Sequence, residues 1–148
     1  MGDGALGAEW SFGDPTDDEV DGLGLLWRLH THAVTERLPR DRTIVHVQLT
    51  GLGGVDGWLD VADHEVTVCR DDPGRDVHLA VQADTRQMQR WLLGLVPFRA
   101  LVQRGHARLL GPGQLARQFP TWFDTGMFSE SLQRGRRRQE LELGRAAS

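Results

Sequence analysis

Four consecutive segments in which apolar and polar residues alternate are the feature that most constrains the fold of this chain. They cover residues 43–50, 57–62, 65–70 and 77–83. Because successive side chains of a strand point to opposite faces, each segment has one apolar and one polar face. Stretches rich in Gly and Asp separate the segments and favour turns. The pattern predicts an antiparallel meander with a single buried face that needs a cover.

The sequence that follows predicts helices that supply this cover. Asp84 is a good N-cap, and Gln87 three residues later completes a capping-box pattern. The apolar residues of this helix recur at the spacing i, i+3, i+4, i+7. They are Met88, Trp91, Leu92 and Leu95. Pro97 opens a second short helix that Gly105 ends. Its inward residues are expected to be Phe98, Leu101 and Val102.

Three further elements complete the predicted fold. Residues 106–111 are expected to form a last strand, and residues 111–123 a last helix that breaks at Pro120. A helix within residues 19–38 precedes the strands. Its predicted buried stripe is Val20, Leu23 and Trp27. The fold class is therefore α+β, with a mostly antiparallel sheet of about five strands and helices packed on one face.

Composition changes at both ends of the chain. Residues 1–19 are rich in Gly and Asp and predict a flexible acidic arm, either mobile or loosely docked. Residues 20–128 form the predicted domain, and residues 129–148 a disordered tail of mixed charge. Four of the basic residues of this tail lie close together, namely Arg134, Arg136, Arg137 and Arg138.

Length, charge and cysteine content exclude several classes of protein. A chain of 148 residues fits one domain with a real core. A net charge of −4 argues against nucleic-acid binding, and no apolar run is long enough to span a membrane. The single cysteine, Cys69, excludes an internal disulfide and a cysteine-based zinc site. With no secretory signal, the expected location is the cytoplasm.

No motif for phosphate binding or nucleophilic catalysis occurs, and no catalytic residue is assigned. His30 and His32 would point apart on a helix and are not expected to hold a metal. A second polar set lies on the polar faces of the strands. Cys and His beside a carboxylate could form a nucleophilic or metal site, but solvent or a partner is the favoured neighbour. The set comprises His46, Asp60, Cys69 and His78.

Aromatic residues are the strongest indication of a ligand. They fall on the inward faces of the predicted helices, above the apolar face of the sheet. The set is Trp91, Phe98, Phe119, Trp122 and Phe123. Such a stripe is typical of a packed core, and an apolar cavity is the alternative.

The order of elements and several segments resemble the sterol carrier protein 2-like domain. The matching segments are EVTVC at 65–69, DPGRDVHLAVQAD at 72–84, RALVQRGHARLLGP at 99–112 and FPTW at 119–122. The sequence looks most similar to the actinobacterial type fused to HxlR-type winged-helix regulators. An acidic arm stands here in place of the winged helix, so DNA binding is not carried over.

The resemblance implies an apolar tunnel between sheet and helices that holds a lipid, acyl chain, sterol or polyketide- or terpenoid-like metabolite. No cofactor or metal is implied. The residues carried over as tunnel walls are Val66, Val68, Leu79, Val81, Met88, Trp91, Leu92, Phe98, Leu101, Leu109, Phe119 and Trp122.

Three functions are consistent with this sequence. The leading one is a carrier or sensor of a small apolar molecule, with Arg86, Arg90 and Arg104 as candidates to meet a ligand carboxylate. The second is a pocket enzyme that cyclises or isomerises an apolar natural-product precursor. Its candidate polar groups are Asp60, Cys69, Asp76 and His78. The third is an interaction module that binds a second copy or a regulatory protein.

Overall fold

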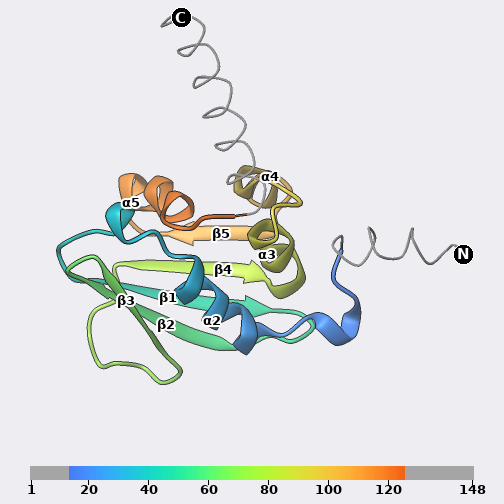
Figure 1. Ribbon diagram of the computed structural model, residues 1–148, viewed down its shortest axis with the longest axis horizontal. Helices are drawn as coiled ribbons and strands as arrows, with labels where there is room; N and C mark the ends of the chain where they lie inside the picture. Colours follow the sequence, from blue (N-terminus) through green and yellow to red (C-terminus); the bar gives the residue numbers. More distant parts are fainter. Residues whose placement is uncertain (1–13, 126–148) are drawn as a thin grey trace, which may run out of the picture.

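The computed structural model describes residues 14–125, which fold into a five-stranded sheet covered by short helices (Figure 1). The strands are β1 (Thr43–Thr50), β2 (Asp56–Ala62), β3 (Glu65–Cys69), β4 (Leu79–Asp84) and β5 (Ala107–Leu110). Their order in the sheet is β3-β2-β1-β4-β5, and every neighbouring pair is antiparallel except β1 and β4. The predicted α+β class with a mostly antiparallel sheet is confirmed.

The prediction of a simple meander is wrong. β4 does not pair with β3; it runs parallel to β1, with Val45 opposite Leu79 and Val47 opposite Val81. Alternation fixes the face on which each side chain lies, but it does not fix which strands are neighbours. Pairing with β1 places Leu79 and Val81 in the middle of the buried face, where both are 0% exposed. Val77 lies before β4 and is exposed.

The first helix, α2 (Gly22–His32), lies in front of the sheet in Figure 1 and buries a different face from the predicted one. Asp21 caps it by accepting a hydrogen bond from the Leu23 amide. The buried leucines are Leu25, Leu26 and Leu29. Val20, before the helix, is buried as predicted, whereas Trp27 is 56% exposed.

Glycines explain this orientation of α2. A Cβ atom on Gly57 of β2 would lie 2.4 Å from Cδ1 of Leu26. A Cβ atom on Gly22 would lie 2.4 Å from the Gly53 carbonyl oxygen. The helix therefore approaches the sheet on the side of Gly22 and Leu26, which turns Trp27 outward.

The remaining helices follow the sequence more closely. α3 (Thr85–Leu92) begins where predicted, since the Asp84 carboxylate accepts a hydrogen bond from the Gln87 amide at 3.1 Å. In α4 (Phe98–Gln103), Phe98 and Leu101 are buried. Val102 is exposed because it lies one residue after Leu101, which is 100° further around the helix. α5 (Gly113–Gln118) passes at Pro120 into the 3₁₀ helix η3 (Phe119–Trp122), which confirms the predicted break.

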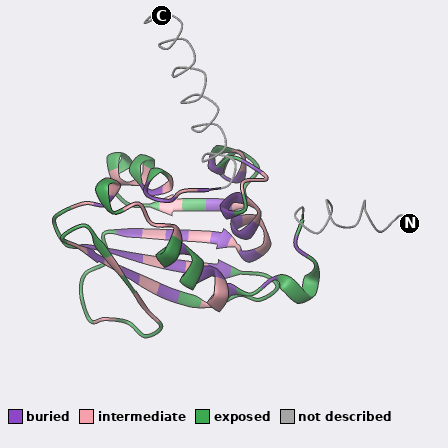
Figure 2. Cartoon of the chain, in the orientation of Figure 1, coloured by how far each residue is buried: buried purple, intermediate pink, exposed green. Residues whose placement is uncertain are grey.

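Short 3₁₀ turns flank α2, namely η1 (Asp17–Glu19) and η2 (Thr35–Arg37). Of the predicted acidic arm, residues 14–19 are described and lie against α3. Residues 1–13 and the predicted tail at 129–148, with its arginines, lie outside the described residues. Figure 2 shows burial alternating along the strands, as expected for a sheet covered on one face.

Candidate functional site

All twelve residues predicted as tunnel walls belong to, or pack against, one hydrophobic cluster between the sheet and the helices. Nine of them are buried, and the other three, Val66, Val68 and Leu109, are half-buried at its margin. The sheet supplies the floor through side chains such as Leu79 and Val81, and α3 and α4 supply Met88 and Leu101 above it. The structure therefore brings these residues together, while their role as ligand contacts stays a prediction.

Aromatic rings form the roof of this cluster. Phe119 is central, with ring centroids 5.5 Å from Trp122, 5.2 Å from Phe123 and 6.2 Å from Phe98. Trp91 meets Phe98 at 5.0 Å and Phe123 at 5.9 Å. These pairs pack edge-to-face, a favourable arrangement for aromatic rings. The roof thus comes from two places in the chain, α3–α4 and residues 119–123.

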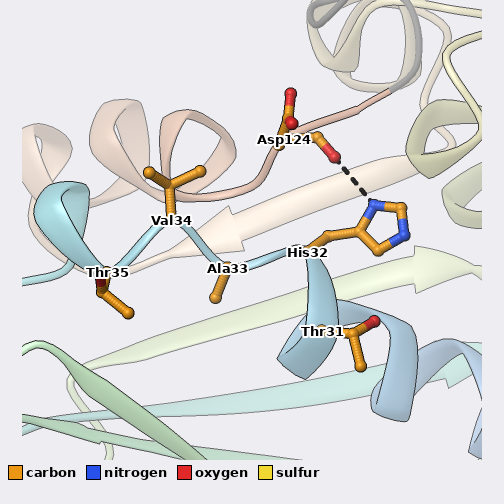
Figure 3. Close-up of a pocket in the computed structure, with 6 residues that line it drawn as sticks. All are labelled: Thr31, His32, Ala33, Val34, Thr35 and Asp124. Carbon is orange, nitrogen blue, oxygen red and sulfur yellow. Dashed lines mark hydrogen bonds between the residues drawn. The ribbon is translucent and has the colours of Figure 1, made fainter.

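A hollow of about 490 Å³ lies beside this roof, where the chain leaves α2 (Figure 3). Its lining residues are Thr31, His32, Ala33, Val34, Thr35 and Asp124. Ala33 also packs against the hydrophobic cluster, so the floor of the hollow borders the core. The hollow lies next to the aromatic roof, because its lining residue Asp124 directly follows Phe123 in the chain.

Main-chain hydrogen bonds join the two segments that flank the hollow. Ala33 and Phe123 form an isolated antiparallel bridge. The Val34 amide donates to the Trp122 carbonyl at 2.7 Å, and the Asp124 amide donates to the His32 carbonyl at 2.8 Å. Nδ1 of His32 lies 2.8 Å from the Asp124 carbonyl oxygen (Figure 3). These bonds hold the end of the roof to the end of α2.

The polar set His46, Asp60, Cys69 and His78 does not enter the cluster or the hollow. The His46 ring stacks on Trp58 with centroids 4.5 Å apart, on the face of the sheet opposite the cluster. Asp60 pairs with Arg42 at 3.7 Å, and Nδ1 of His78 accepts a hydrogen bond from the Ile44 amide.

Cys69 is a half-buried thiol on the same side of the sheet. Burial raises the pKa of the Cys69 thiol, and the nearby Asp60 carboxylate raises it further. A raised pKa disfavours the thiolate that nucleophilic catalysis needs. The raised pKa therefore argues against Cys69 as a nucleophile.

Two of the three candidate arginines are engaged by residues 14–21 rather than exposed to a ligand. Arg86 donates to the Pro15 carbonyl and pairs with Asp17, and Arg90 pairs with Asp14. Between them, Gln89 is 3% exposed. Its amide nitrogen donates to the Glu19 carbonyl at 2.9 Å, and its oxygen accepts from the Asp21 amide at 3.4 Å. Arg104 is exposed.

Hydrogen bonds from the Thr16 amide and hydroxyl lower the pKa of the Glu19 carboxyl in the same segment. Because Glu19 is exposed, this local bond organises the 3₁₀ turn η1 and adds little to the overall stability. Residues 14–21 therefore form a defined strap over α3.

The two histidines of α2 do not form a joint metal site. His30 packs its ring against Trp27, whereas His32 bonds to Asp124, so the two rings do not share a ligand position. Within residues 14–125, no three His, Cys, Asp or Glu side chains are grouped to hold a metal ion. Over the same range, no helix is both long and apolar enough to cross a membrane.

Comparisons with known proteins agree with this architecture. No protein-family model and no curated protein matches the sequence. Among solved structures, the crystal structure of sterol carrier protein 2 like 2 (SCP2-L2) from Aedes aegypti aligns over 66% of this chain and 92% of that chain, with a TM-score of 0.52 and 15% identity. The solution structure of palmitated SCP2L2 from the same species aligns over 66% and 88%, with a TM-score of 0.52 and 12% identity. The chain has the sterol carrier protein 2 fold.

The same fold occurs as part of a larger protein. The sec-alkylsulfatase Pisa1 from Pseudomonas sp. aligns over 66% of this chain with a TM-score of 0.53 and 14% identity. The alignment covers 15% of the alkylsulfatase. At such identities the likeness concerns the fold, and the finer resemblance to domains fused to winged-helix regulators stays a prediction.

The hollow was not predicted from the sequence. In the sequence, His32 stands out only through its spacing from His30, and Asp124 belongs to no pattern. Their proximity depends on the Ala33–Phe123 bridge, which joins positions far apart in the chain. No local spacing signals such a contact.

Proposed function

We propose that this protein binds a small apolar molecule between its sheet and its helices, as a carrier or sensor. The observation that carries the proposal is the single cluster that unites all twelve predicted wall residues under an aromatic roof. The fold adds support, because a palmitated protein of the same fold is among the similar structures. Affinity would come from removing apolar ligand surface from water, at about 25 cal/mol per Å² before losses.

The roof segment is the part best placed to yield to a ligand. Phe119, Trp122 and Phe123 lie on a short 3₁₀ helix and the residue after it, rather than on a long helix. Hydrogen bonds beside the hollow hold this segment to the end of α2. Displacing it would open the cluster at Ala33 while leaving the sheet pairing intact. The proposed path of the ligand therefore runs from the hollow, past Ala33, into the cluster.

The distribution of polar groups favours binding over chemistry. The candidate groups for a pocket enzyme lie on the opposite face of the sheet or, like Asp76, on an exposed loop. The cluster itself consists of apolar side chains. We therefore expect an apolar molecule that binds there to be released without chemical change.

Nuclear magnetic resonance of methyl groups in the full chain tests the location of binding. We expect dodecanol, added in steps, to shift the methyl signals of Met88, Leu101 and Val81, which line the cluster. The Ala80 methyl, on the opposite face of β4, is the internal control and is expected to stay unchanged. Native mass spectrometry would show one dodecanol per chain.

Shifts confined to exposed positions such as Leu52, or no stoichiometric complex with dodecanol, lauric acid or dodecylamine, would overturn the proposal. In that case the interaction module would become the better hypothesis. It predicts shifts when a second protein, rather than a lipid, is added.

A further inference from the structure

Charge is divided unevenly along the described chain. Residues 85–123 contain six arginines and no Asp or Glu, whereas residues 14–84 contain fifteen acidic residues and six arginines. Residues 85–123 comprise α3, α4, β5, α5 and η3, so the helices that follow β4 are the basic part of an otherwise acidic chain. A surface of one sign attracts a partner of the opposite sign even though the net charge of the chain is −4.

The outer sides of α3 and α4 combine arginines with exposed apolar residues. In α3, Arg86, Arg90 and the C-cap residue Leu93 follow at spacings of four and three residues, which places them on one side of the helix. In α4, Arg99 and Val102 are three residues apart, and both are exposed. The exposed fractions of Leu93 and Val102 are 40% and 44%.

The inner sides of the two helices meet at the aromatic roof. Trp91 of α3 packs edge-to-face on Phe98 of α4, with ring centroids 5.0 Å apart. Both rings belong to the hydrophobic cluster. The outer sides of α3 and α4 therefore face away from the cluster, on the solvent side of the layer that covers it.

The arginines at the α4 end of this surface are free to meet an external anion. Within residues 14–125, the side chains of Arg99 and Arg104 form neither an ion pair nor a hydrogen bond. A guanidinium group carries N–H donors in a planar arrangement that matches the oxygens of a phosphate or a carboxylate. Val102, next to them on α4, offers an apolar contact beside that charge.

The strap covers the α3 end of the same surface. Asp17 pairs with Arg86, and Asp14 pairs with Arg90. The other carboxylates of the strap do not pair with α3 and belong to Asp18, Glu19 and Asp21. Each of the two pairs joins a partly exposed arginine to a largely exposed carboxylate, so each contributes little to stability and yields to a competing anion.

We propose that the outer side of α3 and α4 docks on an anionic lipid surface. The lipid head groups would bind the free arginines of α4 and compete with the strap for Arg86 and Arg90. Leu93 and Val102 would enter the boundary between head groups and acyl chains, since basic and apolar residues side by side are typical of segments that lie in a membrane interface. The choice of a lipid surface over an acidic protein rests on the proposed function, because a carrier or sensor of apolar molecules meets its ligand in a lipid phase.

Sedimentation of the full chain with lipid vesicles tests this docking. Phosphatidylcholine vesicles that contain about 30% phosphatidylglycerol are compared with vesicles of phosphatidylcholine alone, in about 100 mM NaCl. Each arginine near an anionic surface contributes a factor of about five to binding, so Arg99→Gln/Arg104→Gln is expected to weaken binding about twentyfold. Arg70→Gln/Arg75→Gln is the matched control, because it removes the same charge from exposed positions in the other part of the chain.

Competition by the strap predicts a change in the opposite direction. Asp14→Asn/Asp17→Asn is expected to tighten binding to the anionic vesicles about tenfold, because it releases the arginines of α3. Asp71→Asn/Asp76→Asn is the control, since it removes two carboxylates that are exposed outside the strap. Equal effects of these two variants would overturn the competition.

The exposed apolar residues separate a lipid surface from any other anionic partner. Leu93→Ser/Val102→Ser keeps every charge and is expected to weaken vesicle binding about fivefold through loss of apolar burial. Leu52→Ser is the control, because Leu52 is 53% exposed and lies outside α3 and α4. Circular dichroism of each variant checks that the fold is unchanged.

The outcomes distinguish this inference from the proposed function. Equal binding to anionic and neutral vesicles, no binding to either, or equal effects of the two arginine variants would overturn the docking surface. Binding to poly-L-glutamate but not to vesicles would assign the surface to an acidic protein and would also overturn it. Dodecanol binding is measured without vesicles, so a chain that binds dodecanol but no vesicle loses this inference alone. A preference for anionic vesicles that Arg99→Gln/Arg104→Gln removes, and Arg70→Gln/Arg75→Gln does not, supports the docking surface.

Discussion

Truncation of Phe119 tests whether the aromatic roof is a packed part of the core. Its side chain is 0% exposed and contacts the rings of Phe98, Trp122 and Phe123. Phe119→Ala removes the ring and leaves a cavity, which costs about 4 kcal/mol in buried sites. Loss of the edge-to-face contacts lies within that range.

This loss is measurable because it is a large fraction of the free energy of unfolding. A domain of this size has a free energy of unfolding of about 5–15 kcal/mol, so the variant is expected to stay folded with a melting temperature lower by about 15 °C. Urea unfolding followed by far-ultraviolet circular dichroism gives the free energy of unfolding directly. Phe119→Leu, which keeps most of the apolar volume, should cost about 1 kcal/mol.

Trp27→Ala is the matched control. It removes a larger aromatic side chain, but one that is 56% exposed on α2 and contacts the His30 ring alone among aromatic residues of the described range. We expect a loss below about 1 kcal/mol. A loss below 1.5 kcal/mol for Phe119→Ala, or an equal loss for both variants, would refute the packed roof.

Three further changes are expected to have specific effects. Gly57→Ala should lower the free energy of unfolding by about 2 kcal/mol, because the new Cβ atom meets the fully buried Leu26 at 2.4 Å; thermal unfolding measures this. Gln89→Leu should cost about 1–2 kcal/mol by removing the two hydrogen bonds to the strap, and limited proteolysis should cut the strap sooner. Cys69, whose pKa is raised, should react with iodoacetamide more slowly than free cysteine at pH 8. Its contribution to stability is constant below the unfolded thiol's pKa and is lost as pH rises through the folded pKa, so a stability gain above pH 9 would contradict the shift.

Features set by neighbouring residues were predictable from the sequence. The Asp84 cap, the end of α5 before Pro120 and the buried face of β1 each depend on a few adjacent positions. The wall residues could be predicted as one set for the same reason, because each helix or strand repeats its apolar residues at the spacing of its own backbone.

Features that depend on contacts between distant segments were not predictable. β1 and β3 show the same alternation of apolar and polar residues, so the pattern does not decide which of them pairs with β4. The buried face of α2 depends on Gly57, a residue of a different element, and not on the pattern of α2 itself. The hollow depends on the meeting of Ala33 and Phe123, which no periodicity encodes.

The parallel pair at the centre of the sheet also shapes how the chain must fold. β1, β2 and β3 join through tight turns, and β4, α3, α4 and β5 follow one another with short connections, so each half can form from local contacts. The halves meet along β1 and β4, whose contact closes a loop that contains all of β2 and β3. Closing that loop carries an entropic cost before any contact between β1 and β4 forms. We therefore expect the folding rate to be limited by the pairing of the two halves and not by the formation of either half. A chain cut in the exposed stretch 70–76 should give two fragments that complement one another.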